Sequence, residues 1–437
     1  MFTPRNRGWL YRFMNHKKKI IFFSAATAWS INYAKMSMEI MFICRTTFNF
    51  RERQILLEYC CKAKKYGDEP ISRFGNIRKI SVLINKDDDF GRAKKNFEKY
   101  ALPLFHFAGL DIEIINCNNN EFPDEQVNLL RRSQSDTLYI VGGDEIISKT
   151  VNNAMRSEMF HLTQLKMKYE FPVLAFFPVG GSNYIAKTFF SPVSSRVKNY
   201  CESAMAVIDG KCQSANCFKY KIGEEEESIA LGYVYCGDAT GVFEKKYRFF
   251  RRFQEKLSAL YYTLTHKVHA KKLELSYVEP CAGCSKCSVY KTLLTPQQHW
   301  WHKLIGTRSI VSSADKVINR GQAINLNCGE EKHVKLSTVV FKLANDLLSD
   351  DPPKMDLLVG PKSITRWQFL NELWKRSNSN NPYSVSSDFQ TSLAGRSFRC
   401  HITSTDETTL VVDGKKLPSA DISVEIVPSL IQVLVPK

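Results

Sequence analysis

Short apolar runs alternate with amphipathic stretches from residue 79 onward in this 437-residue chain. Apolar runs bounded by polar residues are typical of buried strands, whereas apolar residues spaced three and four apart are typical of helices. Such alternation indicates a doubly wound α/β domain, in which helices cover a parallel sheet. The pattern predicts strands at 79–85, 111–117, 137–141 and 172–178, and helices at 91–107, 124–132, 145–156 and 183–189.

The pattern changes after Gly210, where short β-branched runs are separated by charged or glycine-containing turns. These runs predict an antiparallel β-sandwich, so the chain is expected to combine α/β and all-β parts. They lie at 217–222, 228–234, 336–341, 408–412 and 422–426. The expected divisions are a basic N-terminal segment over 1–75, an α/β domain over 76–208, and a β-sandwich over 209–437 with a cysteine-containing insertion near 265–332.

The strand at 137–141 leads directly into Gly142, Gly143 and Asp144, and a predicted helix follows. Glycines let the backbone turn sharply and approach a ligand, and the free N–H groups at a helix start attract anions. We therefore expect a phosphate site at this turn, with Asp144 placed to hold Mg²⁺ or to orient a hydroxyl. An ordinary strand–helix turn could have the same sequence.

Two further predicted strands are followed by residues of the same kind. Asn85 ends the first strand, and Gly180, Gly181 and Asn183 follow the strand at 172–178. Ligands bind beyond the carboxyl ends of the strands in such sheets. We therefore expect these residues to gather at one edge of the sheet, beside the glycine turn.

The formal net charge of +17 favours anionic partners, which include nucleotides, nucleic acids and anionic lipid surfaces. The residues before Glu39 include basic side chains and no acidic one, as mitochondrial presequences do. The apolar run over 20–34 is shorter than a comfortable bilayer span. It could anchor the chain at a membrane interface, or belong to a buried or cleaved leader.

Thirteen cysteines are scattered along the chain, and only Cys281, Cys284 and Cys287 have regular spacing. Without a secretory cleavage pattern, a disulfide framework is not expected. The run of three cysteines, followed by His299 and His302, offers ligands that suit tetrahedral Zn²⁺. A redox-active or reactive cluster and a reduced surface loop are the alternatives.

Three spaced motifs resemble the diacylglycerol kinase catalytic family, which includes sphingosine, ceramide and acylglycerol kinases. The strand that ends at Asn85, with the loop after it, resembles the opening of that family. The turn at 142–144 resembles the start of its Gly-Gly-Asp-Gly-Thr signature, and 177–183 is similar to its Pro-Leu-Gly-Thr-Gly-Asn segment. Residues 96–111 are most similar to the mitochondrial acylglycerol kinase branch.

The resemblance implies a lipid kinase that uses ATP and Mg²⁺ to convert mono- or diacylglycerol into lysophosphatidic or phosphatidic acid. Asp144 would act on Mg²⁺–ATP, and Asp413 would be the base that accepts the proton of the acceptor hydroxyl. The residues placed against ATP are Asn85, Gly142, Gly143, Gly180, Gly181 and Asn183.

The resemblance also implies a location and partners. It places the chain at the mitochondrial inner membrane, on the side of the intermembrane space, in contact with an acylglycerol lipid and an anionic membrane surface. The net charge alone would suit nucleic acid, but no motif calls for that partner.

The chain departs from the family motifs at three places. Glu145 and Ile146 stand where the family has Gly-Thr, Lys415 replaces the acidic residue of its Asp-Gly-Glu motif, and 180–182 reads Gly-Gly-Ser. A like charge about 5 Å from a phosphate costs roughly 3 kcal/mol at intermediate dielectric, although Glu145 could instead bind a second metal ion. The alternative function is a catalytically weakened relative that serves as a structural subunit of the inner-membrane carrier translocase.

Overall fold

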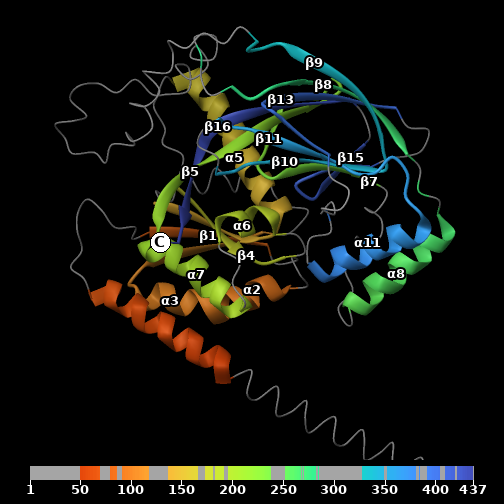
Figure 1. The fold of residues 1–437 in the computed structure, drawn as a ribbon. Coiled ribbons are helices and arrows are strands. Elements are labelled where there is room, and N and C mark those ends of the chain that lie inside the picture. Colours follow the sequence, from red (N-terminus) through yellow and green to blue (C-terminus); the bar gives the residue numbers. More distant parts are fainter. Residues whose placement is uncertain are drawn as a thin grey trace, which may run out of the picture. The chain divides into compact units, whose positions relative to one another are not determined.

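The structure is a computed structural model, and Figure 1 presents its fold. It describes residues 50–68, 79–85, 91–117, 136–165, 173–180, 183–190, 195–237, 251–266, 268, 270–281, 284, 327–348, 352–379, 383, 391–403, 409–418 and 421–436. Residues 1–49, the helix expected at 124–132, Gly181, Cys287, His299 and His302 lie outside this set.

The chain forms two compact units, Met1–Cys61 and Lys62–Lys437. In the first unit the structure describes residues 50–61, which are helical. This helix continues to residue 68 and lies within the predicted N-terminal segment. All the elements described below belong to the second unit.

Four parallel strands in the order β2–β1–β3–β4 form the predicted α/β sheet. β1 and β3 are buried along almost their whole length because helices cover both faces, which is why they read as continuous apolar runs in the sequence. Their bounds are Lys79–Asn85 for β1, Asp111–Cys117 for β2, Thr137–Gly142 for β3 and Val173–Pro178 for β4.

Alternate side chains of β3 contact helices on opposite faces of the sheet. Leu138 and Ile140 belong to a core cluster with α5 (Asp144–Leu165) and α6 (Tyr184–Phe189). Tyr139 meets Phe105 of α3 (Leu102–Phe107) edge to face, with ring centroids 5.2 Å apart. It also hydrogen-bonds to Ser203 of α7 (Arg196–Asp209). The predicted doubly wound arrangement is therefore confirmed.

The helix predicted over 91–107 forms in three consecutive pieces, α2 (Arg92–Asn96), a π-helical turn η3 (Phe97–Ala101), and α3. Pro103 lies at the start of α3 and has no N–H group to donate to the preceding turn. The wider turn accommodates this missing donor, and Leu102 donates its N–H to the carbonyl of Phe97.

The predicted β-sandwich consists of two facing sheets. The second sheet has the order β12–β11–β10–β7–β14–β15, and all its pairs are antiparallel. Its bounds are Tyr233–Gly237 (β7), Val340–Asn345 (β10), Met355–Val359 (β11), Thr391–Gly395 (β12), Thr409–Val412 (β14) and Lys415–Pro418 (β15).

The first sheet supplies the other layer through its antiparallel strands. Leu275 and Phe398 of this layer share one core cluster with Phe341 and Leu410 of the second sheet. The strands are Lys211–Ile222 (β5), Ser228–Ala230 (β6), Lys271–Val278 (β8), Glu331–Thr338 (β9), Ser397–Thr403 (β13) and Ile422–Val435 (β16).

Strand β16 joins the sandwich to the parallel sheet (Figure 1). Its first half pairs with β13, and its second half lies parallel to β4 through the pair Val433 and Leu174. An irregularity between Val427 and Ile431, where Ser429 has a φ of 53°, separates the two halves. The α/β and all-β parts therefore share one ten-stranded sheet.

Two helices, α8 (Arg251–Thr265) and α11 (Arg366–Ser379), lie side by side in Figure 1. Ala259 packs with Phe369 and Leu373 in their shared core. In the part of the chain that the structure describes, no helix combines the length and apolar character needed to cross a bilayer.

Candidate active site

The glycine turn after β3 is followed directly by α5, the longest described helix of this region. The helix begins at Asp144, one residue before the predicted start, and Gly143 accepts hydrogen bonds at its carbonyl from Ile146 and Ile147 at 3.1 and 3.2 Å. A Cβ atom on Gly142 would lie 3.1 Å from the Cβ of Ile146, so this position is closely packed. The turn therefore presents a helix N-terminus at the carboxyl end of β3, as the sequence predicted.

Asp144 is 1% exposed and connects this turn to α6. Its Oδ2 accepts a hydrogen bond from the N–H of Tyr184, and its Oδ1 accepts one from the N–H of Ile185, both at 2.9 Å. The first N–H groups of a helix have no partner within it, so a carboxylate at this place stabilises the helix start. Asp144 thus fixes the N-terminus of α6 against that of α5.

The residues before α6 form the second predicted motif. Gly180 has a φ of 118°, which a side chain would strain, and its carbonyl accepts a hydrogen bond from Asn183 Nδ2 at 3.2 Å. Asn183 Oδ1 is buried and has no hydrogen-bond partner among the described residues. A buried acceptor without a donor is costly, so this atom fits a donor or metal ion brought by a ligand. Asn85 is 2% exposed at the end of β1.

Asp413 lies in the turn between β14 and β15 with a φ of 47° and is completely buried. Its carboxylate accepts hydrogen bonds from the N–H groups of Leu231 at 2.8 Å, Gly232 at 3.0 Å and Tyr233 at 2.7 Å. Burial raises the pKa of Asp413 to about 6, although these three donors oppose the shift. Asp144 adds to the rise in pKa because two carboxylates repel each other.

The motifs that are far apart in the sequence meet in the fold. A Cβ atom on Gly232 would lie 2.8 Å from Oδ1 of Asp413 and 3.0 Å from Cγ1 of Ile185. Gly414, with a φ of 88°, would place its Cβ 3.4 Å from that of Glu145. Gly414 therefore lies against the start of α5, and Asp413 approaches the start of α6 through Gly232; these helix starts hold the glycine-turn and Asn183 motifs.

Lys342 of β10 belongs to this region although sequence reasoning did not select it. It is 3% exposed, and its Nζ lies 4.1 Å from the ring centroid of Tyr184 and 4.7 Å from that of Tyr233. Burial lowers the pKa of Lys342 to about 8, and the negative charges of Asp144 and Asp413 partly oppose this shift. The signal in the sequence was a lysine within the otherwise apolar run 340–344.

Two residues that depart from the family motifs, Glu145 and Lys415, have side chains that reach solvent. Glu145 is about half exposed and forms an ion pair with Lys149, one turn further along α5, at 2.7 Å. Lys415 begins β15 and is exposed. The charge that opposes a phosphate at the glycine turn is therefore partly neutralised by Lys149.

The cysteine cluster differs in membership from the predicted one. The sulfur atoms of Cys281, Cys284 and Cys328 all lie within 4.8 Å of one another. Cys287 lies outside the described residues. Cys328 was not selected from the sequence because it is far from the regular run.

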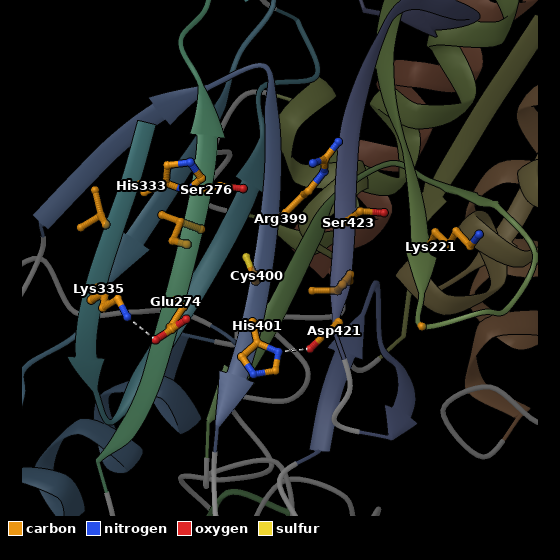
Figure 2. Close-up of a pocket in the computed structure, with 14 residues that line it drawn as sticks. Lys221, Glu274, Ser276, His333, Lys335, Arg399, Cys400, His401, Asp421 and Ser423 are labelled. Atoms are coloured by element: carbon orange, nitrogen blue, oxygen red, sulfur yellow. Dashed lines mark hydrogen bonds and ion pairs between the residues drawn. The ribbon is translucent and has the colours of Figure 1, made fainter. Parts of the chain in front are cut away.

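A separate concavity of about 540 Å³ lies on the outer face of the first sheet. Figure 2 shows two pairs of its charged side chains in contact, Lys335 with Glu274 and His401 with Asp421. None of the motif residues lines it. Because the motif residues meet elsewhere, we place the candidate site at their meeting point and not here.

Comparison with known proteins shows what the chain is similar to. Residues 79–220 match the sequence profile of the diacylglycerol kinase catalytic domain. The mitochondrial acylglycerol kinase of Mus musculus is 22% identical over 329 residues, which are 71% of this chain and 72% of the mouse protein. These similarities support a lipid kinase of the diacylglycerol kinase family.

Two other similarities accompany this assignment. An uncharacterised protein of Caenorhabditis elegans is 27% identical over 374 residues, which are 83% of this chain and 79% of the other. A solved diacylglycerol kinase from Bacillus anthracis aligns with a TM-score of 0.45 and 14% identity, covering 83% of this chain and 98% of that one. The glycine turn and Asn183 fall inside the catalytic-domain match, and Asp413 falls outside it.

Proposed function

We propose that this chain is a lipid kinase that transfers the γ-phosphate of ATP to mono- or diacylglycerol, giving lysophosphatidic or phosphatidic acid. One observation supports it above the others. The glycine turn, the Asn183 segment and the Asp413–Gly414 turn, which are separated by up to 272 residues, contact one another through Asp144, Gly232 and Glu145. Such a meeting of three motifs at the carboxyl edge of a parallel sheet is where a nucleotide site is expected.

ATP would be held by the residues around the starts of α5 and α6. The N-terminus of α5 and the glycines before it suit the phosphates, because backbone N–H groups there attract anions. Asn183 Oδ1 still lacks a partner among the described residues. Bound Mg²⁺ would absorb charge on the phosphates, and Asp144 is the motif carboxylate proposed to hold it. Asn85, Gly180 and Gly181 complete the proposed set.

Asp413 is the proposed general base for the acceptor hydroxyl. A base with a pKa of about 6 is ionised at neutral pH and can still accept a proton. Its three backbone donors hold the carboxylate in one orientation. A base role requires the acceptor hydroxyl to reach the Asp413 carboxylate, which is fully buried in this structure. The pH dependence of kcat/KM tests this role.

We also propose a mitochondrial location, on the inner membrane and facing the intermembrane space. The acylglycerol kinases of Mus musculus and Homo sapiens are named as mitochondrial proteins, and the N-terminal residues have a basic, acid-poor composition. The net charge of +17 suits an anionic membrane surface, where the lipid would be met. No observation on the described residues favours the translocase-subunit alternative.

The test is phosphate transfer from ATP to monoacylglycerol, diacylglycerol, ceramide and sphingosine by the full chain. Wild type is compared with Asp144→Asn, Asp413→Asn and Glu145→Gly. Asp421→Asn is the matched control, because Asp421 is exposed in the separate concavity. We expect product from the glycerolipids with wild type and with Asp421→Asn, and none with Asp413→Asn.

Thermal unfolding of every variant must accompany the assay. Asp144 and Asp413 each satisfy buried backbone N–H groups, so their replacement destabilises the fold by about 1–3 kcal/mol regardless of chemistry. A folded wild type that transfers phosphate to none of the four lipids would reject the proposal. Activity that appears only in Glu145→Gly would indicate a site disabled by that carboxylate.

A further inference from the structure

Three cysteines from two segments of the chain meet beside the sandwich. The sulfur atoms of Cys281, Cys284 and Cys328 lie within 4.8 Å of one another. Cys284 is fully buried, Cys328 is 9% exposed, and Cys281 is half-buried. No disulfide joins any of them. Three thiols this close together, two of them buried and none in a disulfide, form a ligand set for a soft metal ion.

The backbone places two of these cysteines opposite each other. β8 and β9 are antiparallel neighbours, and their final pair is Val278 with Glu331. Cys281 lies three residues beyond Val278, and Cys328 lies three residues before Glu331, so continuation of the register makes them direct partners. Cys281 immediately precedes the segment 282–327, and Cys328 immediately follows it. The cluster therefore stands at the base of the predicted cysteine-containing insertion.

The spacing of the sulfur atoms suits zinc. Tetrahedral Zn²⁺ with Zn–S bonds of about 2.3 Å requires neighbouring sulfur atoms about 3.8 Å apart, which lies within the observed limit. Cys281 and Cys284 have the two-residue separation common in structural zinc sites. Gly329 has a φ of 92°, which allows the turn that follows Cys328.

A nearby cation compensates the negative charge that such a cluster carries. Arg396 Nη1 lies 3.9 Å from Cys328 Sγ. The backbone N–H of Arg396 donates to the carbonyl of Val278 at 2.8 Å, which fixes this residue beside the end of β8. Three thiolates with one divalent ion have a net negative charge, and a guanidinium at this distance offsets part of it.

We propose that Cys281, Cys284 and Cys328 bind a structural Zn²⁺, which links the two ends of segment 282–327. The expected run of Cys281, Cys284 and Cys287 is thereby revised, because Cys328 contributes a ligand from the opposite strand. The site is independent of the kinase chemistry, since none of its residues belongs to the motifs that meet at Asp413. A zinc ion here ties two strand ends together, much as a disulfide would in an oxidising compartment.

The first experiment measures the metal content of the full chain purified under reducing conditions without added metal. We expect about one zinc ion per chain in wild type and less than about a tenth of that in Cys284→Ser and Cys328→Ser. Cys400→Ser is the matched control, because Cys400 is also buried in the sandwich but lies outside the cluster, and it should retain zinc.

A second measurement covers the case in which a serine variant fails to fold. Wild type is treated with a chelator, and cleavage by trypsin is followed. We expect new cuts at the lysines and arginines of 282–327, and their loss when zinc is restored. Replacement by Co²⁺ should give the visible absorption of a tetrahedral thiolate complex. Absence of metal in wild type, zinc retained by Cys328→Ser, or iron with sulfide in place of zinc would each overturn the proposal.

Discussion

A Cβ atom on Gly232 would lie 2.8 Å from Oδ1 of Asp413, closer than a carbon and an oxygen atom normally pack. The N–H of Gly232 also donates to both oxygens of that carboxylate, at 3.0 and 3.1 Å. Gly232 is therefore the backbone position that lets the Asp413 side chain lie between β7 and the start of α6.

Replacement of Gly232 by alanine should displace the Asp413 carboxylate and lower both stability and kinase activity. We expect the free energy of unfolding to fall by about 1–3 kcal/mol, since the added methyl group also meets Ile185. Denaturant unfolding and phosphate transfer measure the two effects. Gly223→Ala is the control, because no atom lies within 4 Å of its Cβ position and only left-handed strain of about 1 kcal/mol is added. Full activity in Gly232→Ala would show that the contact does not position Asp413.

The titration of Asp413 should appear in both stability and rate. Its folded-state pKa of about 6 lies above the ordinary value of 3.8, so the folded protein holds this proton more strongly than the unfolded chain. The free energy of unfolding of wild type, relative to Asp413→Asn, should therefore decrease by up to about 3 kcal/mol as the pH rises from about 4 to about 6.

If Asp413 is the base, kcat/KM should rise with pH through about 6 and level off above it. Titration of the purified enzyme in buffers of constant ionic strength, with unfolding followed in the same buffers, measures both quantities. A rate that does not change between pH 5 and pH 7 would assign Asp413 a purely structural role.

Replacement of the buried Lys342 should shift the pH at which kcat/KM rises. A cation favours the ionised form of nearby carboxylates, so in Lys342→Met this rise in kcat/KM should occur about one pH unit higher. In wild type the same lysine, with its pKa lowered to about 8, makes the fold more stable as the pH rises from about 8 to about 10.5. This rise should be missing in Lys342→Met. Lys335→Met, on the outer face of the first sheet, is the control and should leave the profile unchanged.

Glu145 and Lys149 should influence ATP binding in opposite directions. Glu145→Gln removes a negative charge at the start of α5 and should tighten ATP binding by about two- to tenfold, whereas Lys149→Met should weaken it by a similar factor. The exposed pair Glu274 and Lys335 gives matched controls away from the site. Equilibrium binding of ATP at two salt concentrations measures the effect, which should shrink at high salt. Weaker binding in Glu145→Gln would instead indicate that Glu145 holds a metal ion.

The local pattern of apolar and polar residues was sufficient to predict the α/β sheet. The predicted strands at 79–85 and 111–117 agree with β1 and β2, and the alternation with helices correctly gave a parallel sheet. The sheet edge also gathered the glycine turn and Asn183 as expected. These features follow from short-range periodicity and from the rule that parallel strands end at one edge.

Features that depend on strand pairing could not be predicted in the same way. Lys342 approaches Tyr184 only because β10 lies beside β7, and Cys328 reaches Cys281 only through the register of β8 with β9. The pairing of Asp144 with the start of α6 is likewise a contact between two helices that local propensity does not specify. Sequence spacing alone carries no information about which strands become neighbours.

The position of β16 between β4 and β13 bears on how the protein acquires its structure. Until residues 422–435 have left the ribosome, the edge of β4 has no partner, and an unpaired strand edge is prone to associate with other chains. Closure of the parallel sheet therefore waits for a contact between Leu174 and Val433, which are separated by more than half of the chain. Contacts of such long sequence separation slow folding. The parallel sheet should accordingly be completed only once β16 has been made.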